Sequence, residues 1–211
     1  MHGNTGEVLE ALLRGAREAG ADVAVRSISD LTINPCVACD ACHRTGICAQ
    51  KDDFQALWAA MREADMLVLA SPNYIVSVSA QLKALFDRCC GPVHLMALDG
   101  KYAAAVVTAG GGGCEEVETY ILRFARSLGC RTVGSIGVEA GELMDGEAAA
   151  EALKRAEELG GRLVAAARAN EVMAEQEPER AAHAERMKAL VTAMREQWPY
   201  EYDYWQQAGR L

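Results

Sequence analysis

The chain has 211 residues, of which 51% are hydrophobic, and a formal net charge of −9 at pH 7. This length and composition predict one globular domain with a full core, plus an appended element. The acidic balance argues against nucleic-acid binding, which requires a basic face. No stretch is long and apolar enough to span a membrane, and no secretory signal opens the sequence, so we expect a cytoplasmic protein.

Strand-like and helix-like segments alternate along the chain, which is typical of a parallel sheet with helices on both faces. Asn4 is expected to cap a helix over residues 5–19, with Glu7 three residues later as in a capping box. The expected strands cover residues 21–28, 66–70, 102–108 and 132–138, and further helices cover 52–63, 79–90, 115–128 and 146–169. These patterns predict an α/β domain over residues 1–170 and a C-terminal extension over residues 171–211.

Four of the eight cysteines lie close together in the segment 35–48: Cys36, Cys39, Cys42 and Cys48. Thiolates at this density repel one another and oxidise easily, so a shared metal is the chemical reason to gather them. Three cysteines at successive x₂ spacing can bind one face of an iron–sulfur cubane, and a fourth can complete the site after a turn. Gly46 suits that turn because it tolerates positive φ. We interpret the segment as an iron–sulfur site of the 4Fe-4S type.

Other interpretations of these cysteines stay open. Structural zinc also takes four thiolates, although usually from two separated pairs, and the thiols could be uncoordinated or redox-active. A disulfide framework is typical of oxidising compartments. The remaining cysteines, Cys89, Cys90, Cys114 and Cys130, are expected to be small core residues. His43 is expected to be solvated, with tuning of the metal centre as the alternative.

Three segments are candidates for binding a cofactor at the carboxyl ends of the strands, where open α/β sheets bind ligands. Pro72 and Tyr74 place a rigid residue and an aromatic ring after one strand. The run Thr108-Ala109-Gly110-Gly111-Gly112-Gly113 brings unhindered backbone after the next strand. Asn4-Thr5 offers helix N-terminal donors to a phosphate. Their joint placement predicts a cofactor site.

At this point the chain resembles a known family. The run Asn34-Pro35-Cys36-Val37-Ala38-Cys39-Asp40-Ala41-Cys42, followed by Gly46-Ile47-Cys48 and Asp52-Asp53, is similar to the flavodoxin-like iron–sulfur flavoproteins. The segments 71–74 and 79–88 are similar to the same family, which belongs to the NADPH-dependent FMN reductase superfamily. The similarity covers about residues 2–140.

The resemblance implies a doubly wound, three-layer, flavodoxin-like sheet that binds FMN, and it implies that the four loop cysteines are the cluster ligands. Gly3-Asn4-Thr5 matches the end of the family's flavin-phosphate loop, and Tyr74 is the best candidate for flavin contact. Family members are typically dimers or tetramers, so a homodimer or homotetramer is expected, with flavin and cluster close across a subunit contact. The implied flavin-binding residues are Asn4, Thr5, Pro72, Asn73, Tyr74, Ile75, Ser77, Thr108, Ala109, Gly110, Gly111, Gly112 and Gly113.

One feature departs from the family pattern. In relatives, a strand and a serine-rich phosphate loop precede Gly-Asn-Thr, whereas this sequence starts at Met1-His2. That strand would be the central one in the 2-1-3-4-5 order of a flavodoxin-like sheet. We therefore expect a sheet without its first strand and a phosphate site with fewer donors.

The end of the chain is rich in aromatic residues. A stripe of Met187, Leu190, Val191, Met194 and Trp198 predicts a helix, and residues 198–205 hold five aromatic side chains. This tail is expected to pack either on its own domain or on a second protomer.

Together these features predict an FMN- and iron–sulfur-dependent oxidoreductase that transfers electrons between a cluster and flavin, with no catalytic side chain required. The expected electron donor is NAD(P)H, or a small redox partner such as ferredoxin. One alternative is an NAD(P)H-dependent FMN or quinone reductase whose cysteines hold no cluster. A second alternative is a zinc-stabilised, non-catalytic binding module.

Overall fold

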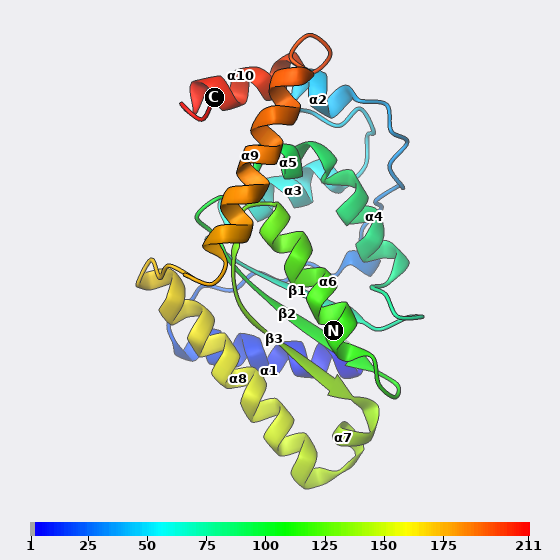
Figure 1. The fold of residues 1–211 in the computed structure, drawn as a ribbon. Coiled ribbons are helices and arrows are strands. Elements are labelled where there is room, and N and C mark those ends of the chain that lie inside the picture. Colours follow the sequence, from blue (N-terminus) through cyan, green and yellow to red (C-terminus); the bar gives the residue numbers. More distant parts are fainter. Residues whose placement is uncertain (1–2) are drawn as a thin grey trace.

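The computed structural model describes residues 3–211. Its three strands form one parallel sheet in the order β1-β2-β3 (Figure 1). The elements in chain order are α1 (Asn4–Glu18), the 3₁₀ helix η1 (Ile28–Asp30), α2 (Ala41–Thr45), α3 (Phe54–Glu63), β1 (Met66–Pro72), α4 (Ala80–Arg88), α5 (Cys90–Leu95), β2 (Tyr102–Ala109), α6 (Cys114–Ser127), β3 (Arg131–Glu139), α7 (Ala140–Met144), α8 (Gly146–Arg168), α9 (Glu177–Ala193) and α10 (Pro199–Gln207).

The sheet is the middle of three layers, and β2 is its most buried strand. Alternate residues of a strand face opposite sides of a sheet. Ala105 and Val107 of β2 pack in the core with α3, α4 and α6, whereas Val106 packs with α1 and α8. Pro72 at the end of β1 lies opposite Thr108 of β2, so the carboxyl ends of these strands are adjacent. The expected α/β, doubly wound architecture is confirmed.

The strand expected over residues 21–28 is wrong. Residues 21–27 have no regular secondary structure, and η1 follows them. Val23 and Val25 are nevertheless partly buried against the core formed by α1, β1 and α8. In the expected sheet order this segment would pair only with a first strand, and among residues 3–211 no strand precedes β1. The apolar side chains of this segment are therefore buried, whereas its backbone has no neighbouring strand with which to form sheet hydrogen bonds.

The other differences concern helix boundaries. The helix expected over residues 79–90 divides at Cys89 into α4 and α5, and α5 continues to Leu95. The helix expected over residues 52–63 begins at Phe54, because the Asp52 carboxylate lies before the helix and accepts the Phe54 backbone N–H at 3.1 Å.

The C-terminal extension packs on its own chain. Met187 and Val191 of α9 and Trp205 of α10 are buried together with Leu95 and Met96. Of the two arrangements expected for the tail, the structure shows the intrachain one. No helix among the described residues has the length and hydropathy of a membrane span.

Two glycines allow α1 and α8 to approach closely on one face of the sheet. A Cβ added at Gly15 would lie 2.0 Å from the Glu157 carbonyl oxygen, and one at Gly160 would lie 2.0 Å from the Leu12 carbonyl oxygen. Both contacts are with backbone, which cannot move aside as a flexible side chain can. The packing of α1 against α8 therefore depends on these two positions.

We expect Gly160→Ala to lower the free energy of unfolding by about 1–3 kcal/mol, because the added methyl forces the helices apart. Gly161 provides the matched control, since a Cβ there meets no atom within 4 Å. Gly161→Ala should be neutral or stabilising by up to about 1 kcal/mol through helix propensity. Urea unfolding of both variants checks this, and equal stability of the two would contradict the close helix contact.

Candidate flavin and iron–sulfur site

The three segments predicted to bind flavin meet at the carboxyl edge of the sheet. The Thr5 and Thr108 hydroxyl oxygens are hydrogen bonded at 2.5 Å, which joins the start of α1 to the end of β2. The Asn73 backbone N–H donates to the Thr108 carbonyl at 2.7 Å, and its side-chain Nδ2 donates to the Gly113 carbonyl at 3.0 Å. The loops after β1 and β2 are therefore tied together beside the start of α1, where Asn4 is exposed.

Several polar groups on this edge lack protein partners. The Asn73 Oδ1 atom is buried and has no hydrogen-bond partner. Gly110 and Gly111 are exposed, and a Cβ on either would meet no atom within 4 Å. The first N–H groups of any α-helix, including α1, have no partner within the helix. A buried free acceptor beside open backbone fits a polar ring with a phosphate group, such as a flavin nucleotide.

The turn after β1 is strained and apolar. Tyr74, Ile75 and Val76 are 64%, 96% and 66% exposed. Ile75 and Val76 have φ of 51° and 57°, a left-handed conformation that β-branched residues rarely adopt. The Tyr74 N–H donates to the Ser77 carbonyl at 2.9 Å and closes the turn. Exposed apolar side chains held at this edge fit contact with a flat ring.

The remaining predicted residues differ in what they can offer a ligand. Thr108 and Ala109 are buried at the end of β2, and Pro72 is partly buried at the end of β1. A cavity of about 590 Å³ opens beside the start of α1. Asn4 lines it, together with other residues of α1 and Leu153 of α8, whereas the loops after β1 and β2 do not.

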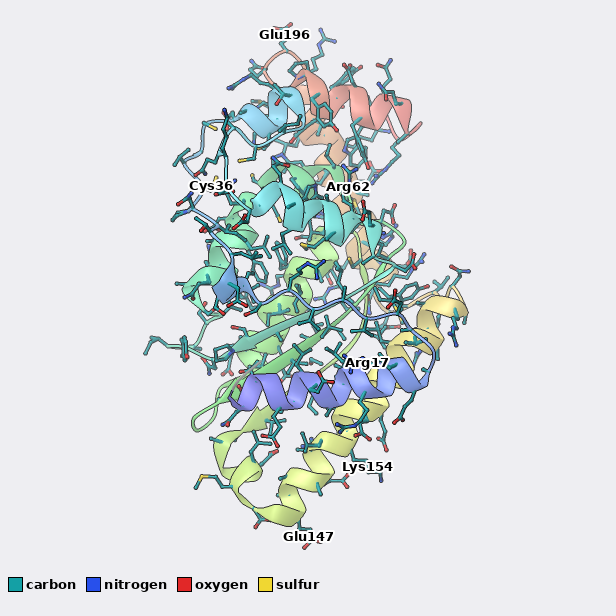
Figure 2. All side chains as sticks on the ribbon, turned by 180° about the vertical axis from the view of Figure 1, so that it is seen from behind. Arg17, Cys36, Arg62, Glu147, Lys154 and Glu196 are labelled. Atoms are coloured by element: carbon teal, nitrogen blue, oxygen red, sulfur yellow. The ribbon has the colours of Figure 1, made fainter. Side chains whose placement is uncertain are left out.

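The cysteine loop presents free thiols. Cys36 and Cys39 are exposed, Cys42 and Cys48 are partly buried, and all are unpaired. Figure 2 shows Cys36 at the periphery of the molecule. No three of these sulfur atoms lie within 4.8 Å of one another. Ligands of one zinc ion at about 2.3 Å can be no more than about 4.6 Å apart, whereas ligands of a multi-iron cluster bind different metal atoms. The thiols as placed here therefore do not form a ready-made site for one zinc ion.

Unusual backbone conformations shape this loop. Ala38 and Asp40, on either side of Cys39, have φ of 50° and 56°. Gly46 has φ of 76° and ends α2, as expected for the turn before Cys48. A Cβ at Gly46 would also lie 2.3 Å from the Tyr200 ring, so a larger residue there would displace this side chain of α10.

A buried ion pair closes the base of the loop. Arg88 Nη1 donates to Asp52 Oδ2 at 2.7 Å and to the Asn34 carbonyl at 2.9 Å, while Nη2 donates to Asp52 Oδ1 at 3.1 Å. The Asn34 N–H in turn donates to Asp52 Oδ2 at 2.9 Å. Arg88 and Asp52 have side chains that are 0% and 1% exposed. The two ends of the loop are therefore fixed to the end of α4, a role that the sequence did not reveal.

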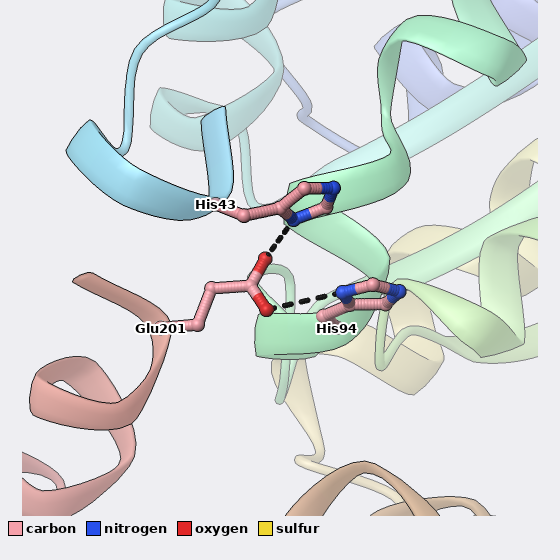
Figure 3. A group of neighbouring side chains, drawn as sticks. All are labelled: His43, His94 and Glu201. Atoms are coloured by element: carbon pink, nitrogen blue, oxygen red, sulfur yellow. Dashed lines mark hydrogen bonds and ion pairs between the residues drawn. The ribbon is translucent and has the colours of Figure 1, made fainter. Parts of the chain in front are cut away.

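A second buried group joins His43 of the loop to α5 and α10, and the sequence did not reveal it either. Glu201 of α10 accepts from His43 of α2 at 2.5 Å and from His94 of α5 at 3.0 Å, both at Nδ1 (Figure 3). Trp198 stacks on both rings, with centroid separations of 4.5 and 5.2 Å. The expectation that His43 is solvated is wrong, because α10 covers it and leaves it 4% exposed.

Two of the four cysteines expected in the core, Cys89 and Cys130, are buried, and Cys114 is partly buried. Cys90 is exposed, so the expectation that it is a core residue is wrong. Its Sγ lies 3.9 Å from Nε2 of His94. Hydrogen bonding to His43, and then to His94, lowers the pKa of Cys90 to about 6, although partial burial opposes the shift. Burial, as the largest cause, raises the pKa of Cys89 above its usual value.

We expect Cys90 to react with iodoacetamide as a thiolate from about pH 6 upward, because its depressed pKa keeps it ionised at neutral pH. The rate should level off by about pH 7, whereas an ordinary thiol would still be gaining reactivity at about pH 8.5. Peptide mapping by mass spectrometry measures the rate, with the buried Cys89 as the unreactive internal control. His94→Asn should move the midpoint upward. A midpoint above pH 8 in the unaltered protein would contradict this environment.

The sequence of this chain is similar to those of known proteins. The family described as NADPH-dependent FMN reductase matches residues 1–143. An iron-sulfur flavoprotein of Archaeoglobus fulgidus is 33% identical over 215 residues, which cover 99% of this chain and 94% of the relative. The chain belongs to the iron–sulfur flavoproteins of the NADPH-dependent FMN reductase family. As a member of that family it is a flavin-linked oxidoreductase.

Solved structures support the fold of this iron–sulfur flavoprotein. An NAD(P)H:quinone oxidoreductase from Methanothermobacter marburgensis is similar with a TM-score of 0.61 at 19% identity, covering 75% of this chain and 88% of that one. A flavodoxin from the domain Archaea has a TM-score of 0.53 at 18% identity, covering 80% and 93%. At these identities the likeness establishes the flavodoxin-like fold alone.

Proposed function

We propose that this iron–sulfur flavoprotein binds FMN at the carboxyl edge of the sheet and a 4Fe-4S cluster at Cys36, Cys39, Cys42 and Cys48. The observation that carries the proposal is the loop itself: four free thiols on a segment whose two ends are fixed by the Arg88–Asp52 pair. The names of the relatives point to the same pair of prosthetic groups. When bound, the cluster would carry single electrons and the flavin one or two.

The protein's own residues would position both groups. The Asn73 amide, the Gly110–Gly111 backbone and the Tyr74 ring would hold the flavin, and Thr5 with the first N–H groups of α1 would receive its phosphate. Arg88 and Gly46 would fix the shape of the cysteine loop. No side chain has to act as a nucleophile or a general base, so the reaction depends on placement and on the polarity around each group.

We further propose that the chain forms a homodimer or homotetramer, and that NAD(P)H or a small redox protein such as ferredoxin supplies electrons. Stopped-flow reduction of the bound flavin by NADPH and by reduced ferredoxin separates these donors. Rapid reduction by NADPH in iron-free protein would favour the alternative of an FMN or quinone reductase.

The proposal is tested by iron and flavin content after anaerobic purification. We expect about four iron atoms and one flavin per chain in the unaltered protein. Cys39→Ser should lose iron and keep flavin, and Asn73→Ala should lose flavin and keep iron. Cys90→Ser is the matched control, since it removes an exposed thiol outside the proposed ligand set. Iron-free protein from a preparation competent for cluster assembly would contradict the cluster assignment.

A further inference from the structure

His43, His94 and Glu201 form a compact group of potential metal ligands that includes one residue of the cysteine loop, His43, but none of its four cysteines. One ligand atom from each lies within 4.8 Å of the others, and among residues 3–211 they are the one group of three or more histidine, cysteine, aspartate or glutamate residues to do so. The Glu201 carboxylate lies between the two Nδ1 atoms, at 2.5 Å from His43 and 3.0 Å from His94. Glu201 is fully buried.

The surrounding structure holds the three side chains in place. They come from three elements, α2, α5 and α10, that pack against one another. Trp205 Nε1 donates to the His94 carbonyl at 3.0 Å, which fixes α10 to α5. The His94 Nε2 atom, on the ring edge away from Glu201, faces Cys90 at 3.9 Å. A metal-binding histidine commonly has its second nitrogen oriented in this way by another group.

The charges of the group favour a divalent ion. The imidazole rings of His43 and His94 are stacked, with centroids 4.9 Å apart and an interplanar angle of 19°. The Glu201 carboxylate faces both rings, so one negatively charged oxygen donor and two imidazole nitrogens lie around a shared space. A dication there would be bound by one carboxylate and two neutral imidazoles, because metal binding displaces the protons from its ligands.

We propose that His43, His94 and Glu201 form a mononuclear site for a borderline divalent transition-metal ion, with Zn²⁺ as the representative ion. Two imidazole nitrogens and one carboxylate are a donor set that such ions take in proteins, with positions left open for water. This site shares His43 with the cysteine loop, but its donors are nitrogen and oxygen, whereas the four donors proposed for the cluster are sulfur.

Metal analysis with X-ray absorption at the zinc edge tests the proposal on the full-length, anaerobically purified protein. The protein is incubated with excess ZnCl₂, desalted, and assayed for zinc, iron and flavin in the same samples. We expect about one zinc per chain in a nitrogen and oxygen shell at about 2.0–2.1 Å. Glu201→Gln and His94→Asn should each weaken zinc binding at least about tenfold. Glu196→Gln, which removes an exposed carboxylate before α10, should leave it unchanged.

Three results would overturn the proposal: no zinc after incubation, a zinc shell made of sulfur, or zinc binding that is insensitive to both variants. The absorption spectrum of the unaltered protein decides the ligand type even if a variant fails to fold, and circular dichroism monitors folding. Iron and flavin content separate this result from the proposed redox function. Zinc bound by nitrogen and oxygen would support the new site, and absence of iron before the zinc incubation, in a preparation competent for cluster assembly, would contradict the cluster.

Discussion

Replacing Arg88 with methionine is expected to lower the free energy of unfolding by about 3–5 kcal/mol, because it leaves the Asp52 carboxylate buried without its partner. Asp52 is 1% exposed, so water cannot replace the lost donors without opening the base of the cysteine loop. The Asn34 carbonyl also loses its Arg88 donor. Denaturant unfolding measures the loss of stability, and iron content of the anaerobically purified protein reports whether the loop still binds metal.

The exposed ion pair on the same helix is the matched control. Lys83 and Asp87 lie at 2.5 Å, but their side chains are 46% and 47% exposed. Asp87→Asn should change the free energy of unfolding by no more than about 0.5 kcal/mol, since solvent screens such pairs. A similar small effect for Arg88→Met would show that the pair does not fix the loop.

The pH dependence of the Arg88–Asp52 contribution follows from the same contacts. Hydrogen bonding to Arg88 holds the pKa of Asp52 well below its usual range, although burial opposes this. A carboxyl group with a depressed folded-state pKa stabilises the protein above its unfolded-state pKa of about 4, and this contribution is lost as pH falls toward the folded-state value. Asp52→Asn should remove this contribution to the pH dependence of the free energy of unfolding.

Replacing Trp205 with alanine is the second large change, with an expected loss of about 3–5 kcal/mol in the free energy of unfolding. The indole is 2% exposed and packs with Leu95, Met96 and Val191, so its removal leaves a cavity between α10, α5 and α9. It also removes the hydrogen bond to the His94 carbonyl. Thermal unfolding measures the total loss, and hydrogen exchange shows whether α10 separates first and exposes Glu201.

Two further substitutions separate packing from hydrogen bonding at this position. Trp205→Phe keeps an aromatic ring in the core but loses the Nε1–H donor and part of the indole ring system, so it should cost less than Trp205→Ala, about 1–3 kcal/mol. Gln206→Ala, at an exposed position on the same helix, should have little effect. Equal stability of Trp205→Ala and Gln206→Ala would mean that α10 is not anchored by the indole.

The sequence determined the parts of the fold that depend on local periodicity. The continuous apolar runs at 66–70 and 102–108 predicted buried parallel strands, because such strands pack on both faces. The same reasoning predicted a strand at residues 21–28, and that prediction is wrong. The apolar pattern there is satisfied by burial of Val23 and Val25 against the core, but a strand also requires a neighbouring backbone, and no strand among the described residues pairs with this segment.

The candidate sites also contain residues that the sequence predicted and residues that only the structure revealed. The four loop cysteines were found from the sequence because their spacing is short and local. The partners that surround them were not, since Arg88 and Asp52 are 36 positions apart, and Glu201 is 107 from His94 and 158 from His43. Such pairs are made by the packing of α4, α5 and α10 against the loop. The residue types of a site can be read from neighbouring sequence positions. Which charged groups are buried together depends on how distant helices pack.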